Sequence, residues 1–197
     1  SGLSSLQPTR RWDRSQLVDH HLSAPPLILV MGVSGAGKTT IGSLLASRLG
    51  AEFIDADSLH PLSNVEKMAA GNPLTDEDRW PWLHVVGQTL QKAAAVGPEG
   101  TGLVIACSAL RRSYRDAILA EAPRTFFVHL AGDEETLSHR LEGRSDHFMP
   151  TGLLRSQLET LEELDDDEPG ARIDVAATID HILDDSVRAI AASAVTW

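Results

Sequence analysis

The sequence predicts a three-layer α/β fold, in which a five-stranded parallel sheet carries helices on both faces. Two observations predict it. Short apolar runs that suit buried strands alternate with stretches of helical periodicity along most of the chain. A complete phosphate-binding sequence, G-x-x-x-x-G-K-[ST], also stands between the first apolar run and the first helix. Strands joined through helices form parallel sheets, and ligands bind at the carboxyl ends of such strands.

The five strands are expected at residues 27–31, 51–55, 103–107, 125–130 and 173–177. The first helix follows the phosphate-binding sequence, because Ile41, Leu44, Leu45 and Leu49 recur at the spacing of one helix face. Further helices are expected at residues 64–70, 82–95, 111–121, 133–144 and 179–192, and one more is marked by Leu154, Leu158 and Leu161.

Composition limits the class of protein. The chain has 197 residues, 42% of them hydrophobic, and a formal net charge of −11. We expect residues 1–24 to form a polar tail and residues 25–197 to form one domain. The negative charge argues against nucleic acid or an anionic membrane as partner, and no apolar stretch approaches a membrane span. The single cysteine, Cys107, cannot form an internal disulfide, so we expect a reducing compartment, the cytoplasm.

The phosphate-binding sequence is a P-loop, the signature of P-loop nucleotide-binding folds, and it consists of Gly32, Val33, Ser34, Gly35, Ala36, Gly37, Lys38 and Thr39. Its glycines let the backbone turn tightly and present amide N–H groups to phosphate oxygens. Lys38 can reach the β- and γ-phosphates of a nucleotide, and the Thr39 hydroxyl can hold Mg²⁺. A nucleoside triphosphate and Mg²⁺ are therefore the expected ligands of this loop.

Two aspartates follow the second expected strand. Asp55 and Asp57 are two residues apart, so in extended chain both side chains point the same way. Beside a triphosphate, one of the two carboxylates can bind Mg²⁺, directly or through water, and the other can accept a proton from an attacking hydroxyl. The spacing fits equally well with two aspartates that only cap a loop.

Several longer blocks resemble one family. They are Asp55-x-Asp57-x-x-His60-Pro61, x-x-Asn64-x-x-Lys67-Met68, Asp78-Arg79-x-Pro81-Trp82-Leu83, Cys107-Ser108-Ala109-Leu110 with Tyr114-Arg115-Asp116, His147-Phe148-Met149, and Ser156-Gln157 with Glu159-Thr160-Leu161-Glu162. With them, residues 27–180 are similar to gluconokinases, which belong to the shikimate-kinase-like and nucleoside-monophosphate-kinase-like P-loop kinases. The P-loop is common to many enzymes, whereas the blocks around His60 and Arg79 are much more specific.

The resemblance implies ATP-dependent phosphorylation of D-gluconate to 6-phospho-D-gluconate, which feeds the pentose phosphate or Entner–Doudoroff route. It implies substrate contacts by Asp57, His60, Lys67 and Arg79. Asp57 is then expected to orient and deprotonate the O6 hydroxyl, and Asp55 is expected to bind Mg²⁺ with Thr39. The planar fork of Arg79 suits the carboxylate of gluconate, although its spacing also fits an ion pair with Asp76 or Asp78. His60 fits a turn before Pro61 as well, and Lys67 fits a solvated helix face.

On the nucleotide side, the resemblance implies ATP contacts by the P-loop, Thr40, Arg140 and Arg144, with Lys38, Asp57 and Arg144 as the catalytic residues. Arg140 and Arg144 are four apart, hence on one helix face, and an anion between them would relieve their repulsion. Residues 145–150 are expected to form a lid that excludes water from the transferring group. The resemblance also implies a homodimer.

Two alternatives remain open. One is a kinase of the same fold acting on shikimate or a nucleotide; against shikimate, the third strand is followed by Cys107-Ser108-Ala109 and not by a glycine triplet. The other is a nucleotide-binding switch or scaffold without turnover. Release of ADP with and without gluconate separates these alternatives.

Overall fold

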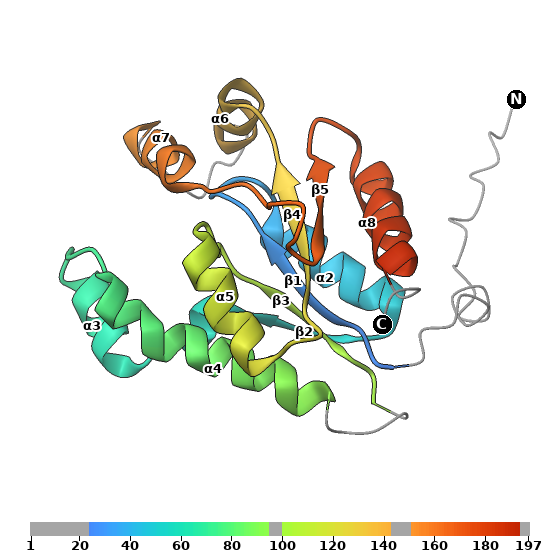
Figure 1. Cartoon of the computed structure of the whole chain (residues 1–197). Helices are drawn as coiled ribbons and strands as arrows, with labels where there is room; N and C mark the ends of the chain where they lie inside the picture. Colours follow the sequence, from blue (N-terminus) through green and yellow to red (C-terminus); the bar gives the residue numbers. More distant parts are fainter. Residues whose placement is uncertain (1–23, 95–99, 143–150, 194–197) are drawn as a thin grey trace, which may run out of the picture.

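The computed structural model describes residues 24–94, 100–142 and 151–193. At its centre is a parallel sheet in the order β2-β3-β1-β4-β5 (Figure 1). The strands are β1 (Leu27–Met31), β2 (Glu52–Asp55), β3 (Leu103–Ala106), β4 (Phe126–Ala131) and β5 (Gly170–Asp174). The expected five-stranded parallel sheet is therefore confirmed.

Helices cover both faces of this sheet. Figure 1 shows α2 (Lys38–Leu49) and α8 (Ile179–Ser193) on one face, and α4 (Asp76–Ala94) and α5 (Arg112–Glu121) on the other. Four shorter elements lie toward the carboxyl ends of the strands: the 3₁₀ helix η1 (Ala56–Leu59), α3 (Leu62–Ala69), α6 (Glu134–Glu142) and α7 (Thr151–Thr160). No helix in the described part of the chain has the length and hydrophobicity needed to cross a membrane.

The alternating side chains of β1 divide the hydrophobic core in two. Ile28 and Val30 pack with α2 and α8, whereas Leu27, Leu29 and Met31 pack with α4 and α5. All five residues are buried, which is why this strand is a continuous apolar run. The P-loop, which begins at the next residue, Gly32, therefore follows a strand that is packed on both faces.

The expected start of α4 at residue 82 was wrong, because the helix begins six residues earlier, at Asp76. Thr75 and Asp78 form a reciprocal cap there. The Thr75 N–H donates to Asp78 Oδ2 at 2.8 Å, and the Asp78 N–H donates to Thr75 Oγ1 at 3.3 Å. Pro81 is accommodated inside the helix.

The fifth strand is also shifted relative to the expectation. β5 pairs with β4 from Phe127 opposite Gly170 to Ala131 opposite Asp174. A Cβ on Gly170 would lie 2.6 Å from the Phe127 carbonyl oxygen, so glycine permits this close pairing. The Asp174 carboxylate then accepts the N–H of Ala176 at 2.8 Å and ends the strand. Residues 175–177 therefore belong to the loop that follows β5.

Candidate active site

The P-loop turns tightly between β1 and α2. Gly35 and Gly37 have φ of 83° and 93°, in the region that favours glycine. A Cβ on Gly32 would lie 2.8 Å from the Leu130 carbonyl oxygen, and one on Gly35 would lie 2.7 Å from Leu141 Cγ. Side chains are thus excluded by β4 on one side of the loop and by α6 on the other.

Lys38 and Thr39 are the first residues of α2. The Lys38 ammonium folds back over the loop and donates to the Val33 carbonyl oxygen at 3.1 Å. The N-terminal N–H groups of α2 and its helix dipole add positive potential at this point. The half-buried Lys38 and the N-terminus of α2 therefore make the mouth of the loop suitable for phosphate.

The Thr39 hydroxyl donates to Asp55 Oδ2 at 3.1 Å, which joins α2 to the end of β2. These two oxygen groups are the metal ligands expected from the sequence, and their chemistry fits Mg²⁺. The described residues hold no cluster of three or more histidine, cysteine or acidic side chains placed for a metal. Mg²⁺ usually takes one or two carboxylates together with substrate phosphates and water.

Asp57 reaches this edge of the sheet by a different route from the one expected. β2 ends at Asp55, and Asp57 belongs to η1, so strand alternation does not orient it. Instead, the Asp57 N–H donates to Asp55 Oδ1 at 3.0 Å. Asp55 is thus both the cap of this turn and the partner of Thr39, and the exposed Asp57 carboxylate lies beside it.

His60 ends η1 and stacks on Trp82 of α4, with ring centroids 4.1 Å apart and planes at 15°. Trp82 Nε1 donates to the Ala56 carbonyl oxygen at 2.8 Å, which fixes η1 against α4. Burial lowers the pKa of His60 below its ordinary value, the Asp57 carboxylate opposes this shift, and the Arg79 guanidinium adds to it. His60, Asp57 and Arg79 are therefore electrostatic neighbours.

Arg79 and Lys67 both have carboxylate partners on α4. Arg79 Nη1 lies 3.4 Å from Asp76 Oδ1 and 3.4 Å from the Tyr114 hydroxyl, which itself donates to Asp76 Oδ1 at 2.6 Å. Lys67 Nζ lies 2.6 Å from Asp78 Oδ2. The ion pair that the spacing of Arg79 also allowed is thus present, with Asp76. Its long distance leaves most of the guanidinium donors for another anion.

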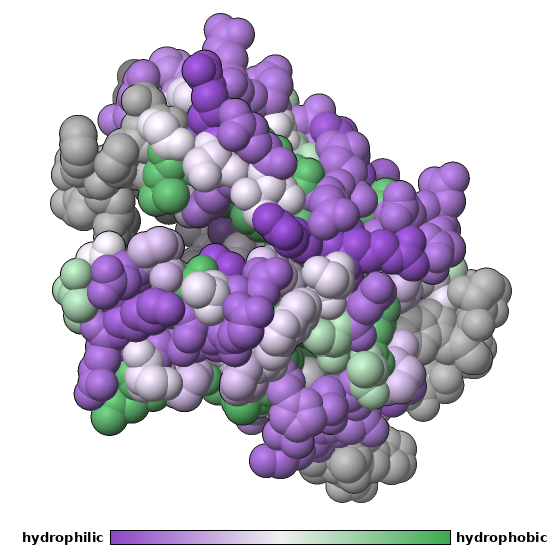
Figure 2. All heavy atoms as spheres, turned by 60° about the vertical axis from the view of Figure 1, so that its left-hand side comes forward, coloured by the Kyte–Doolittle hydropathy of each residue, from purple (hydrophilic) through white to green (hydrophobic). Residues whose placement is uncertain are grey.

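Lys38, Asp55 and Asp57 lie together just beyond the carboxyl ends of β1, β2 and β3. Their charges all act on the pKa of the Cys107 thiol, which lies just after β3. Burial raises its pKa to about 12; the Lys38 ammonium opposes the shift and the Asp57 and Asp55 carboxylates add to it. Figure 2 shows a hollow in the face that carries these strand ends, rimmed largely by hydrophilic residues. The structure therefore brings the P-loop and the aspartates together across one opening.

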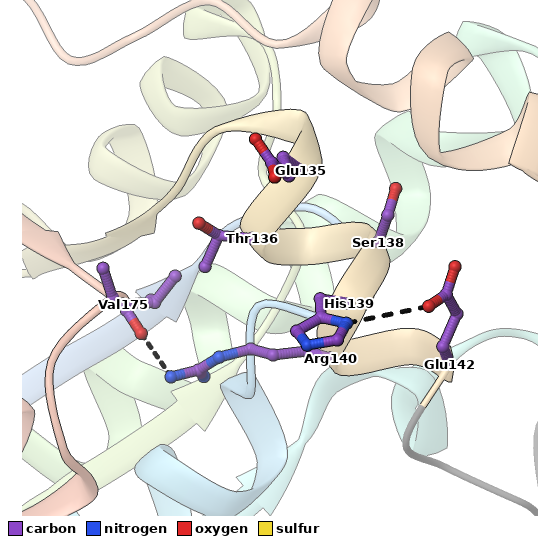
Figure 3. A pocket seen from close by; sticks show the side chains of 8 residues that line it. Glu135, Thr136, Ser138, His139, Arg140, Glu142 and Val175 are labelled. Atoms are coloured by element: carbon purple, nitrogen blue, oxygen red, sulfur yellow. Dashed lines mark hydrogen bonds and ion pairs between the residues drawn. The ribbon is translucent and has the colours of Figure 1, made fainter.

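Arg140 leaves α6 and passes between the P-loop and the loop after β5. Its guanidinium donates to the Val175 carbonyl oxygen, and a Cβ on Gly37 would lie 3.8 Å from its Nη1 (Figure 3). Beside it is a cavity of about 560 Å³, lined by residues of α6 together with Val175 and Ala176. Arg144 and the expected lid, residues 145–150, lie outside the described residues.

Two polar contacts here had no role assigned from sequence. The Tyr114 hydroxyl bridges to Asp76 beside Arg79, and Gln157 Oε1 accepts the Ser34 N–H at 2.7 Å. Both residues lie in blocks that carry the family resemblance, which is the only sequence signal that marks them. Their partners are too far away along the chain for any local pattern to indicate the contact.

Comparisons with known proteins identify the family. The family model for shikimate kinase matches residues 34–195. A gluconokinase from Gluconobacter oxydans is 46% identical over 164 residues, which are 83% of this chain and 90% of that protein. The chain belongs to the gluconokinase family. A second gluconokinase, the thermosensitive one from Escherichia coli, is 42% identical over 83% of this chain and 87% of its own length.

Solved structures support the same assignment. The crystal structure of a gluconokinase from Sinorhizobium meliloti has a TM-score of 0.77 and 42% identity, covering 87% of this chain and 95% of that one. As in other P-loop kinases of this class, ATP is the phosphoryl donor. The α/β P-loop kinase fold expected from the sequence is thereby confirmed.

Proposed function

We propose that this chain transfers the γ-phosphoryl group of ATP to the O6 hydroxyl of D-gluconate, giving 6-phospho-D-gluconate and ADP. The observation that carries the proposal is the placement of Asp57, His60 and Arg79 beside the Thr39–Asp55 contact, opposite the P-loop. A phosphate site and a site with hydrogen-bonding and cationic groups thus share one opening. Gluconate, the substrate named for relatives in this family, has the hydroxyl and carboxylate groups that fit such a pair of sites.

On the donor side, the P-loop of residues 32–39, with the ammonium of Lys38 and with Thr40, holds the phosphate chain, and Arg140 with the cavity of Figure 3 receives the nucleoside end. Arg144 is proposed to reach the transferring group. Thr39 and Asp55 hold Mg²⁺, which when bound offsets charge on the β- and γ-phosphates. Lys38 leaves the Val33 carbonyl oxygen and neutralises the charge that develops on the bridging oxygen.

On the acceptor side, Arg79 binds the gluconate carboxylate, while His60 and Lys67 bind its hydroxyl groups. Burial lowers the pKa of His60, which favours the neutral ring, and a neutral imidazole can both donate and accept. The O6 oxygen forms a bond to the γ-phosphorus as the bond to the bridging oxygen breaks. The O6 proton passes to the Asp57 carboxylate, and ADP leaves.

The wider context of the chain is part of the proposal. The buried free thiol of Cys107 supports a reducing compartment, the cytoplasm. The net charge of −11 supports a small-molecule substrate and no nucleic-acid partner. The resemblance to the family supports a homodimer and a product that enters the pentose phosphate or Entner–Doudoroff route. Light scattering of the purified chain tests the homodimer.

A coupled assay of ADP release tests the activity across gluconate, shikimate, nucleoside monophosphates and other sugar acids. We expect gluconate to give the highest kcat/KM. The control is Lys38→Ala, which should remain folded by circular dichroism and lose most turnover. Preference for shikimate or a nucleotide would replace the proposed substrate, and ADP release unchanged by any acceptor would favour a switch without transfer. Near-normal kcat in folded Lys38→Ala would remove the P-loop from the mechanism.

A further inference from the structure

One peptide unit of the P-loop is held at both of its polar ends. Its carbonyl, on Val33, accepts from Lys38 Nζ at 3.1 Å, and its N–H, on Ser34, donates to Gln157 Oε1 at 2.7 Å. Lys38 lies five residues from Val33, whereas Gln157 is 123 residues from Ser34. The amide group of Gln157 and the ammonium of Lys38 therefore contact the same peptide group of the P-loop.

The position of Gln157 is fixed by its helix. Leu154 is buried in the core, and Leu158, on the same face of α7, packs partly against it. Gln157 lies between them in sequence and is half-buried. Neighbouring α6 also contacts the loop, because Leu141 fills the space next to Gly35. The Gln157 side chain is thus presented to the P-loop by packed helices.

The orientation of this amide leaves its donors unused. Ser34 offers an N–H, so the oxygen of Gln157 must face it and the nitrogen, Nε2, must be the other end of the same planar group. Among the residues that the structure describes, no partner is found for Nε2. Two N–H donors of a neutral side chain are therefore available beside a phosphate-binding loop, on a group that has no negative charge to repel a triphosphate.

We propose that Gln157 binds the γ-phosphate through Nε2 while its Oε1 stays on the Ser34 N–H. The Ser34 N–H of the P-loop then orients the Gln157 amide toward the γ-phosphate, and α7 becomes part of the nucleotide site. The contact forms only with a triphosphate, because ADP has no γ-phosphoryl group. Gln157 consequently distinguishes ATP from ADP, which favours release of the product nucleotide. This inference rests on the proposed use of ATP at the P-loop.

Calorimetry with ADP and with a non-hydrolysable ATP analogue tests it in Gln157→Leu and Gln157→Glu. In Gln157→Leu we expect the affinity for the analogue to fall about tenfold, which is the scale of a hydrogen bond to a charged group. The affinity for ADP should fall less than threefold. Gln157→Glu keeps the acceptor for Ser34 but replaces the donor by a charge, so its loss for the analogue should be larger. The KM for gluconate and the melting temperature should change little.

The matched control is Ser156→Glu, which adds the same charge at an exposed position in the same turn of α7 and should leave both affinities unchanged. Equal weakening of ADP and the analogue would overturn the inference, because it would mean that Gln157 only shapes the loop. Wild-type affinities in both Gln157 variants would overturn it as well. If the wild-type chain bound neither nucleotide, the proposed function would fail together with the inference.

Discussion

Glu168→Gln should destabilise this chain strongly, because it breaks a fully buried ion pair. The side chains of Arg115 and Glu168 are 0% and 1% exposed, and their closest atoms, Nε and Oε1, are 2.6 Å apart. Glutamine keeps the volume of Glu168 but leaves the guanidinium of Arg115 charged and without a counter-charge. Removing one partner of such a pair typically costs about 3–5 kcal/mol. That is a large share of the roughly 5–15 kcal/mol that stabilises a typical domain.

The pair also holds a segment that borders the active site. Arg115 Nη1 donates to the carbonyl oxygens of Ala109 and Leu110 at 3.0 and 3.3 Å. Ala109 has a φ of 43°, which is strained for a residue with a Cβ. The preceding Ser108 carbonyl accepts the N–H of Gly32 at 3.3 Å. Loss of Glu168 should therefore loosen the loop after β3 and lower turnover as well as stability.

Urea unfolding followed by tryptophan fluorescence measures the effect, since Trp82 is buried in the core. The control is Asp167→Asn, which removes a 2.7 Å contact to Arg112 between side chains that are 67% and 35% exposed. Such an exposed pair contributes about 0–1 kcal/mol. A loss below about 1 kcal/mol in Glu168→Gln, or one no larger than in the control, would refute the assignment of a buried charge pair.

Three further predictions follow from the site and the core. Arg79→Lys keeps the charge but loses the planar fork, so the KM for gluconate should rise by the factor that corresponds to a loss of about 1.5–3 kcal/mol of binding free energy, while the KM for ATP stays nearly constant. Equal effects on both KM values would assign Arg79 to phosphate binding or to folding. If Asp57 accepts the O6 proton, the kcat of both Asp57→Asn and Asp57→Ala should fall about 10²–10⁴-fold. A clearly higher kcat in Asp57→Asn than in Asp57→Ala would mean that Asp57 mainly positions the hydroxyl. Burial lowers the pKa of His129 to about 4, below its value in the unfolded chain. Between these two pKa values the unfolded chain binds a proton that the folded chain does not. The free energy of unfolding should therefore fall as the pH drops from about 6.5 to about 4. Urea unfolding of His129→Gln over this range should show a weaker pH dependence than the wild type; identical slopes would contradict a buried neutral His129.

The sequence by itself determined the architecture and the phosphate site. Strand β1, the P-loop and α2 follow from patterns within about twenty neighbouring residues: an apolar run, a glycine-rich motif and a helical periodicity. These features depend on local backbone conformation and on side chains a few positions apart. The blocks around His60 and Arg79 pointed to the second half of the site through their resemblance to a family. The start of α4 could also have been found locally, because Thr75 and Asp78 have the spacing of a capping box.

Only the tertiary structure decided which distant groups meet. It showed that Arg79 shares Asp76 with Tyr114, that Gln157 holds Ser34, and that Glu168 neutralises Arg115 inside the core. Each contact joins residues that helices and strands separate by tens of positions or more. Their side chains meet because the crossover connections of a parallel sheet pack helices and loops from distant parts of the chain against one another. No local periodicity carries that information, because the distance between such residues is set by how whole elements pack.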